Sequence, residues 1–152
     1  MMNDTAAREL AGVLHELAWR IARLGPAKAG VEMLPSSELA VLRAIMDQPG
    51  CSVSDVAAQI SMQSSNVSAA VRSLVERGLV AKHHHAQDRR ITVLEPTSQA
   101  LTNREAIERA VLGTVTDALT PLSEDSVNAL VAAIPAMREL AHQIAAAGWR
   151  QP

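Results

Sequence analysis

The residues best suited to specific chemistry are polar and basic side chains gathered between positions 63 and 90. Serine and asparagine side chains can donate or accept hydrogen bonds at the edges of DNA bases, and arginine pairs with guanine or with phosphate. The candidate DNA-contacting residues are Gln63, Ser64, Ser65, Asn66, Ser68, Arg72, Arg77, Lys82, His84, Asp88, Arg89 and Arg90. Helix capping is a second use for the serines and the asparagine, and the two uses can coexist.

The tripeptide Asp88-Arg89-Arg90 predicts the most specific of these contacts. A narrow minor groove concentrates negative potential, and Arg90 is the best candidate to enter it. Asp88, two residues earlier, is placed to orient the guanidinium through a salt bridge. The alternative interpretation is an ordinary charged pair on the surface of a β-turn, which would contribute little.

The distribution of charge supports this interpretation of the middle segment. Residues 63–94 contain five lysines and arginines against two acids, whereas the whole chain has a formal net charge of −2. A local positive patch in an otherwise acidic chain fits a DNA reader with separate acidic parts. The alternative is a chance cluster of solvated charges. The chain lacks Phe and Tyr and has two Trp, which disfavours recognition of single strands by base stacking.

Apolar residues at helical spacing predict the elements that must position these side chains. The first expected helix covers about 5–24 and is ended by Gly25-Pro26. The second runs from the N-cap Ser36 to Pro49-Gly50 and should bury Leu39, Leu42, Ile45 and Met46. The third runs from the capping box Ser52–Asp55 to Ile60, and the fourth runs from about 63 to Arg77 and should bury Val67, Val71, Leu74 and Val75. Strands are expected over 79–84 and 91–94, followed by a helix from Pro96, in its first turn, to about 119, and by a last helix from 123–125 to Ile144 that Pro135 should kink.

This order predicts a mainly α fold with a small β-wing. A winged helix-turn-helix is expected over 34–95, within a single domain of residues 1–152, flanked by a helical dimerisation part at 5–25 and 96–147. The apolar stripes of the flanking helices exceed what one small core needs, so a homodimer interface is the natural use for the surplus. A monomeric helical bundle is the alternative.

Other candidate sites outside the DNA-contacting set are weaker. His83-His84-His85 could suggest a metal, but successive strand residues point to opposite faces and neither acids nor cysteines support them nearby. No metal or cofactor is therefore expected, and contact with phosphate, stronger when the histidines are protonated, is the favoured use. Cys51, the only cysteine, is interpreted as a small, partly buried residue rather than a redox sensor.

A second binding site is predicted on the first helix. His15, Trp19 and Arg23 are spaced by four residues, so they share a strip of the helix surface. A cation and an indole would suit a small anionic aromatic effector bound between this helix and the winged unit. The alternative is a tryptophan that packs in the protein beside a solvated histidine and arginine.

The middle segment resembles the MarR family of multiple antibiotic resistance regulators. The residues that carry the resemblance are Leu34-Pro35, Val56-Ala57, Ser64-Ser65-Asn66-Val67, Leu74-Val75-Glu76-Arg77-Gly78-Leu79-Val80, Asp88-Arg89-Arg90 and Val93-Leu94. The resemblance implies a homodimeric transcription factor, usually a repressor, on a pseudo-palindromic operator of double-stranded DNA. It also implies that small ligands or thiol oxidation relieve binding. The family often has a basic residue at Ser64 and at Ala69, so this recognition helix is less basic.

Two other classes of function are alternatives to a DNA-binding regulator. The weakened basicity suggests a protein–protein adaptor that no longer reads DNA, but Arg72, Asp88 and Arg90 argue against it. An enzyme is not expected, because no phosphate-cradling loop, metal-ligand spacing or catalytic triad is visible. The sequence also suggests neither a signal peptide nor a membrane span, so a cytoplasmic location is expected.

Overall fold

The computed structural model describes residues 3–148; residues 1–2 and 149–152 of the expected domain 1–152 lie outside the described residues. The elements are α1 (Asp4–Ala29), α2 (Ser36–Asp47), α3 (Val53–Gln59), α4 (Ser64–Glu76), β1 (Val80–His84), β2 (Thr92–Pro96), α5 (Ser98–Leu119), α6 (Glu124–Ala132) and α7 (Ile134–Gly148). The expected fold class, mainly α with a small β-wing, is therefore confirmed. None of the described helices is long and apolar enough to cross a membrane.

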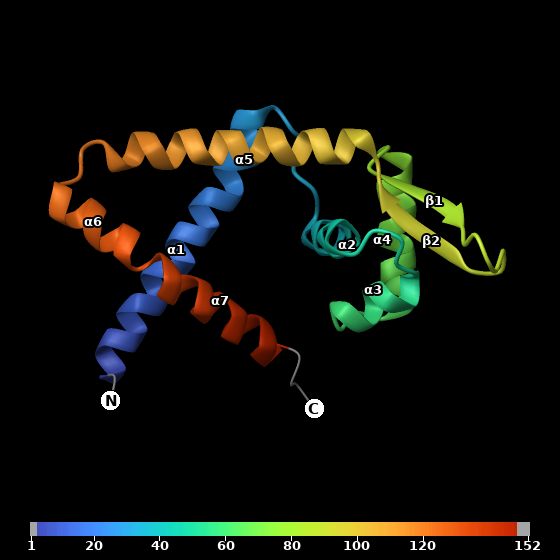
Figure 1. Ribbon diagram of the computed structural model, residues 1–152, viewed down its shortest axis with the longest axis horizontal. Helices are drawn as coiled ribbons and strands as arrows, with labels where there is room; N and C mark the ends of the chain where they lie inside the picture. Colours follow the sequence, from blue (N-terminus) through green and yellow to red (C-terminus); the bar gives the residue numbers. More distant parts are fainter. Residues whose placement is uncertain (1–2, 149–152) are drawn as a thin grey trace.

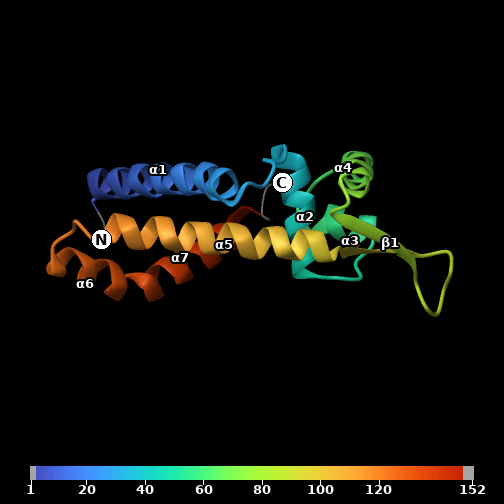
Figure 2. The same ribbon diagram turned by 90° about the horizontal axis from the view of Figure 1, so that it is seen from above.

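The long helix α5 joins two parts of the molecule (Figure 1). The winged unit, which we define as α2, α3, α4 and the β1–β2 hairpin, lies at the N-terminal end of α5, and α6 and α7 follow from its other end. Figure 1 shows the C-terminal end of α1 crossing α5, and Figure 2 shows the same two helices from above. They meet closely at Gly25. A Cβ at Gly25 would lie 3.0 Å from a methyl group of Val111 and 3.1 Å from one of Ile107. Glycine therefore permits this contact between α1 and α5.

The hydrophobic core lies almost entirely in the winged unit. Helix α4 contributes Val67, Val71 and Leu74, each at 0% exposure, but Val75 is 38% exposed, so its expected burial is wrong. Leu39 on α2 is also 38% exposed, whereas Val41 is fully buried in its place. The apolar residues of α2 are spread over two neighbouring faces of the helix, so their spacing does not decide which face is buried. The contact with α3 and α4 decides it. The full core is Val41, Leu42, Ala44, Ile45, Cys51, Val56, Ala57, Val67, Ala70, Val71, Leu74, Leu79, Val80, Leu94 and Ala100.

The predicted capping box at the start of α3 is confirmed. The backbone N–H of Asp55 donates to Ser52 Oγ at 3.2 Å, and the Ser52 backbone N–H donates to the Asp55 carboxylate at 2.8 Å. Two N–H groups at a helix start are satisfied in this way. Hydrogen bonds from the backbone and side chain of Ser52 hold the pKa of Asp55 below its usual range. The box fixes the turn between α2 and α3, and through it the approach to α4.

Loss of this box should destabilise the protein without changing its surface charge. Ser52→Ala should lower the free energy of unfolding by about 1 kcal/mol, the usual effect of removing an N-cap. Because the pKa of Asp55 is lowered in the folded chain, its stabilisation is present above the unfolded pKa of about 3.9 and is lost as pH falls through the folded value. Urea unfolding should therefore separate Asp55→Asn from the parent at pH 7 and bring them together in strong acid. Ser54→Ala, on an exposed neighbour in the same turn, should match the parent at both pH values.

Three predicted helix boundaries are wrong. Helix α1 continues through Pro26 and ends at Gly30, whose left-handed conformation (φ 66°) lets its N–H donate to Ala27 O. Pro35 rather than Ser36 is the N-cap of α2. Pro96 ends β2 instead of entering α5, and Thr97 caps that helix by accepting the Ala100 N–H at 3.2 Å.

The wing is an antiparallel hairpin in which Val80 pairs with Pro96 and His84 pairs with Thr92. Cys51, between α2 and α3, adds a single bridge to this sheet: the Leu94 N–H donates to Cys51 O, and the Gly50 N–H donates to Leu94 O, both at 2.8 Å. The Cys51 side chain is buried, and burial raises the pKa of its thiol. This residue therefore joins the wing to the helices, in an environment that disfavours the reactive thiolate.

The helix expected to kink at Pro135 is broken into α6 and α7, with Ala133 between them. Proline in the first turn of α7 lacks the N–H that would continue the ladder of α6. Among the described side chains of α6 and α7 none is buried. Large apolar residues of this part stay between 37% and 61% exposed: Leu130, Val131, Ile134, Met137, Leu140 and Ile144.

Candidate nucleic-acid interface

Helix α4 turns its core residues inward and leaves a polar face exposed. The exposed residues of this helix and its cap are Gln63, Ser64, Ser65, Asn66, Ser68, Ala69, Arg72, Val75 and Glu76. The helix has no side-chain cap bond at its N-terminus, so the capping alternative for the serines and asparagine is not realised. Ser65, Ser68 and Arg72 lie opposite the core by helical spacing, while Asn66 borders a small crevice beside Glu38 of α2.

The C-terminal end of α4 is fixed by Gly78. Its φ of 71° lies in the left-handed region, and there the Leu79 N–H donates to Leu74 O at 2.9 Å. Thr97 Oγ1 donates to Gly78 O at 2.6 Å. The helix end, the first strand and the start of α5 are therefore bonded to one another, and this holds the polar face of α4 in a fixed relation to the wing.

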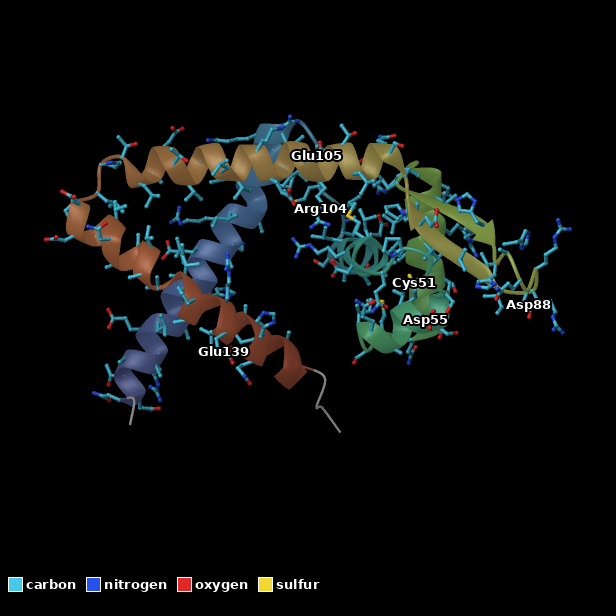
Figure 3. All side chains as sticks on the ribbon, in the orientation of Figure 1. Cys51, Asp55, Asp88, Arg104, Glu105 and Glu139 are labelled. Atoms are coloured by element: carbon cyan, nitrogen blue, oxygen red, sulfur yellow. The ribbon has the colours of Figure 1, made fainter. Side chains whose placement is uncertain are left out.

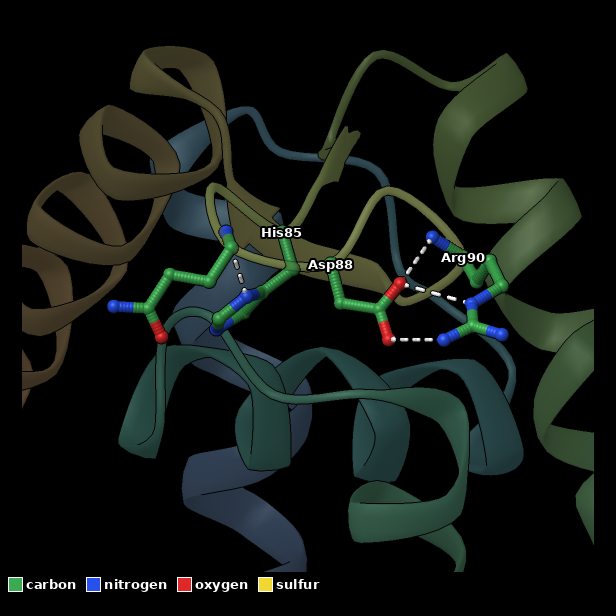
Figure 4. A network of polar contacts seen from close by, with 4 residues as sticks. His85, Asp88 and Arg90 are labelled. Atoms are coloured by element: carbon green, nitrogen blue, oxygen red, sulfur yellow. Dashed lines mark hydrogen bonds and ion pairs between the residues drawn. The ribbon is translucent and has the colours of Figure 1, made fainter.

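The wing tip carries the predicted pair of Asp88 and Arg90 (Figure 4). The Arg90 backbone N–H donates to Asp88 Oδ1 at 3.0 Å, and its Nε and Nη2 lie 3.2 Å and 3.5 Å from Oδ1 and Oδ2. The Arg90 side chain is nonetheless 92% exposed. These hydrogen bonds, the backbone one foremost, keep the pKa of Asp88 below its usual range, so the carboxylate remains charged. A two-point contact preorganises the guanidinium while its outer edge still faces solvent.

Histidines flank this pair on the same hairpin. His85 Nδ1 accepts the Gln87 N–H at 3.2 Å in the turn, and His83 Nε2 lies 3.8 Å from Glu95 Oε2 on the opposite strand. Lys82 and His84 are exposed on β1. Across residues 3–148 no three histidine, cysteine or acidic side chains gather in a way that could hold a metal ion. Figure 3 shows Asp88 at the outer end of the hairpin, remote from Cys51 and Asp55.

Arg77 differs from the other candidate residues because it faces two carboxylates, both from distant segments of the chain. Its Nη1 lies 2.7 Å from Glu32 Oε1, and its Nε lies 3.1 Å from Glu38 Oε2. Its side chain is 30% exposed. Sequence reasoning missed both partners, because they come from the α1–α2 connection and from α2, about forty residues earlier in the chain.

The expected effector residues lie only in part at a cleft. A cavity of about 820 Å³ lies among α1, α2 and the N-terminal half of α5, and Trp19 and Arg23 line it, whereas His15 is not among its lining residues. The Arg23 guanidinium carbon is 5.0 Å from the centre of the Trp19 ring, within the range of a cation–π contact. Glu32 and Arg77 line the same cleft.

The sequence of the winged unit is similar to that of a known protein family. Residues 34–91 match the model of the MarR family. Over this segment the chain is similar to the MarR family. The matched segment includes α4 and the Asp88–Arg90 turn. No curated protein sequence matches the chain.

Solved structures extend the similarity to the flanking helices. A candidate transcriptional regulator from Pseudomonas aeruginosa is 27% identical, with a TM-score of 0.71 over 91% of this chain and 94% of its own. RV1404 from Mycobacterium tuberculosis shares the fold with a TM-score of 0.79 at 15% identity, over 91% and 94% of the two chains. A variant of S. aureus MepR bound to an oligodeoxyribonucleotide has a TM-score of 0.63 at 19% identity, over 90% and 98%.

Proposed function

We propose that the protein is a homodimeric, sequence-specific DNA-binding regulator that represses transcription and is released by a small ligand. The observation that carries the proposal is the wing tip, where Asp88 holds an exposed Arg90 on the same rigid unit as the polar face of α4. A helix for the major groove beside an arginine for the minor groove is the arrangement by which winged helices read DNA. The proposed contacts are Gln63, Ser64, Ser65, Asn66, Ser68, Arg72, Lys82, His84, Arg89 and Arg90, with Asp88 in the orienting role.

The exposed area of one chain supports the dimer. The chain exposes 11,091 Å², whereas a compact monomer of 16.2 kDa exposes about 7,500 Å². Two chains together carry an excess of about 7,200 Å², which is more than the roughly 2,000–5,000 Å² that obligate dimers bury in total, so an interface of that size fits within it. The exposed large apolar residues of α1, α6 and α7 are part of this surface. A second copy would cover this surface and place two recognition helices on the two halves of a pseudo-palindromic operator.

The cleft beside Trp19 and Arg23 supports release by a ligand. Its volume is within the range of sites for small molecules, and it lies between the helical part and the winged unit. An anionic aromatic compound fits the paired indole and guanidinium. Binding of such a compound would change the distance between the two parts, and with it the spacing of the recognition helices in the dimer.

Binding to DNA selected by the protein itself tests the proposal. Repeated selection from a duplex library of random sequence should enrich an inverted repeat, which the chain binds more tightly than random duplex at moderate salt. A shift assay at several salt concentrations then separates base contacts from phosphate contacts. Failure to enrich any sequence, with no salt-dependent binding, would instead favour a protein–protein adaptor.

Asn66→Ala should lower the affinity for the selected sequence and leave that for random duplex nearly unchanged. The Asn66 side chain is exposed on the first turn of α4, where an amide can pair with adenine and contribute about 1–3 kcal/mol of discrimination. Competition with random duplex measures the ratio of the two affinities. Equal losses on both DNAs would show that Asn66 contacts only the backbone.

A further inference from the structure

Arg77 is the residue where three segments of the chain meet. It is the C-cap of α4, and its guanidinium reaches Glu32, in the connection between α1 and α2, and Glu38, in the first turn of α2. Ser73 Oγ accepts from its Nε at 3.4 Å. We call this set the Arg77 bridge, meaning Arg77 with Glu32 and Glu38. It ties the end of the recognition helix to the segment through which the winged unit leaves α1.

Glu38 is the buried member of the Arg77 bridge. Its side chain is 13% exposed, and its Oε2 is buried without any hydrogen-bond partner among the described residues. Arg77 Nε, at 3.1 Å, is therefore close enough to compensate the charge by ion pairing although it makes no aligned hydrogen bond to that oxygen. A buried carboxylate oxygen that loses its cation is strongly destabilised, so Glu38 holds Arg77 against α2.

Glu32 has a different environment, because its side chain is 73% exposed. Its hydrogen bond to Arg77 is the main reason why the pKa of Arg77 is raised above its ordinary value. An exposed pair contributes little to stability. Its position matters more, because Glu32 and Arg77 both line the cleft while Arg77 also ends the helix that carries the DNA-contacting face.

We infer that Arg77 is a positioning residue, which sets the angle of α4 against α2 and the α1–α2 connection, rather than a contact to phosphate. This inference rests on the proposed function, because an angle of α4 matters only if α4 enters DNA. The two roles have opposite consequences for the carboxylates. Next to a phosphate contact, Glu32 and Glu38 repel DNA and weaken binding; in a positioning bridge they orient the helix and strengthen it.

The test compares charge-matched variants on the selected duplex and on random duplex. Glu38→Gln and Glu32→Gln should each lower the affinity for the selected duplex about threefold to tenfold, in the lower part of the range of coupling between contacting residues, although each removes a negative charge. Glu76→Gln, on an exposed acid in the last turn of α4, is the control, and it should bind as tightly as the parent or more tightly. Arg77→Gln should lower the ratio of the two affinities without changing the salt slope, and its effect should not add to that of Glu38→Gln.

Thermal unfolding and one further variant keep the test independent of folding. Thermal unfolding shows which variants are folded at the assay temperature, and exposed Glu32 gives a variant that should remain so. Arg77→Lys, which can hold one carboxylate but not both, should recover part of the lost discrimination. Arg77 would instead be a phosphate contact if Arg77→Gln made the salt slope shallower by about one counterion and Glu38→Gln bound DNA like Glu76→Gln. That result would overturn the inference and leave the proposed function intact. A parent chain that selects no sequence would overturn both.

Discussion

Replacing Arg90 by alanine should lower the affinity for the selected duplex tenfold or more. The variant loses a groove contact and a positive charge, so the logarithmic salt slope should also become shallower by about one counterion. The preorganised geometry is the reason for the size of the effect: two guanidinium nitrogens and the backbone N–H of Arg90 all face Asp88. Shift assays over a range of salt concentrations measure both quantities. Arg89→Ala, at the exposed neighbour, removes the same charge and should change the slope with a smaller loss of affinity.

Asp88→Ala decides whether the pair at the wing tip acts through geometry or through charge. It removes a negative charge near DNA, so simple electrostatics predicts tighter binding. The orienting role predicts weaker binding, because the guanidinium loses the carboxylate that fixes its direction. Tighter binding of the selected duplex by Asp88→Ala would mean that Asp88 and Arg90 are only a charged surface turn.

Leu140→Asp should convert the protein largely to monomer and abolish tight operator binding. Leu140 lies in the apolar series of α7 and is 37% exposed in a single chain. A second copy would bury it, and a carboxylate buried without a partner is strongly unfavourable. A monomer presents one recognition helix, so the affinity gained by binding two half-sites together is lost. Light scattering at micromolar concentration, followed by the shift assay, measures both effects.

His142→Asp is the matched control for this experiment. It places the same acid two residues further along α7, on nearly the opposite side of the helix, and His142 is exposed. This variant should remain a dimer. A parent chain that scatters as a monomer at neutral pH and moderate salt, or a Leu140→Asp variant that remains dimeric, would contradict the proposed interface.

The local features of the fold were predictable because their causes are close in sequence. The capping box joins Ser52 to Asp55, and the wing pair joins Asp88 to Arg90, so spacing alone predicts both contacts. Boundaries failed where distant groups decide them. Gly25-Pro26 has the composition of a helix end, but packing of Gly25 against Val111 and Ile107 keeps it inside α1. Pro96 is a residue type suited to a helix start. Its pairing with Val80 instead makes it the last residue of β2.

In the candidate site, too, local features were predictable and contacts between distant residues were not. Helical periodicity predicts the polar face of α4, and this face is exposed in the structure. The partners of Arg77 do not follow, since a basic residue at the end of a recognition helix suggests phosphate until the folded chain places Glu32 and Glu38 beside it. Trp19 and Arg23 share one face of α1 as expected, but only the path of α2 and α5 decides that the cleft begins beyond His15.

The length of α5 makes it a lever arm. Its 22 residues span about 33 Å at 1.5 Å per residue, and it starts two residues after β2, with Thr97 bonded to Gly78. A rotation of about 10° at the far end of such a rod carries the winged unit through about 6 Å. Half-sites on one face of B-DNA lie about 34 Å apart, so this swing would displace a recognition helix by nearly two base pairs. In the proposed dimer, small changes in packing at α6 and α7 would thereby be amplified into a mismatch with the pitch of the double helix.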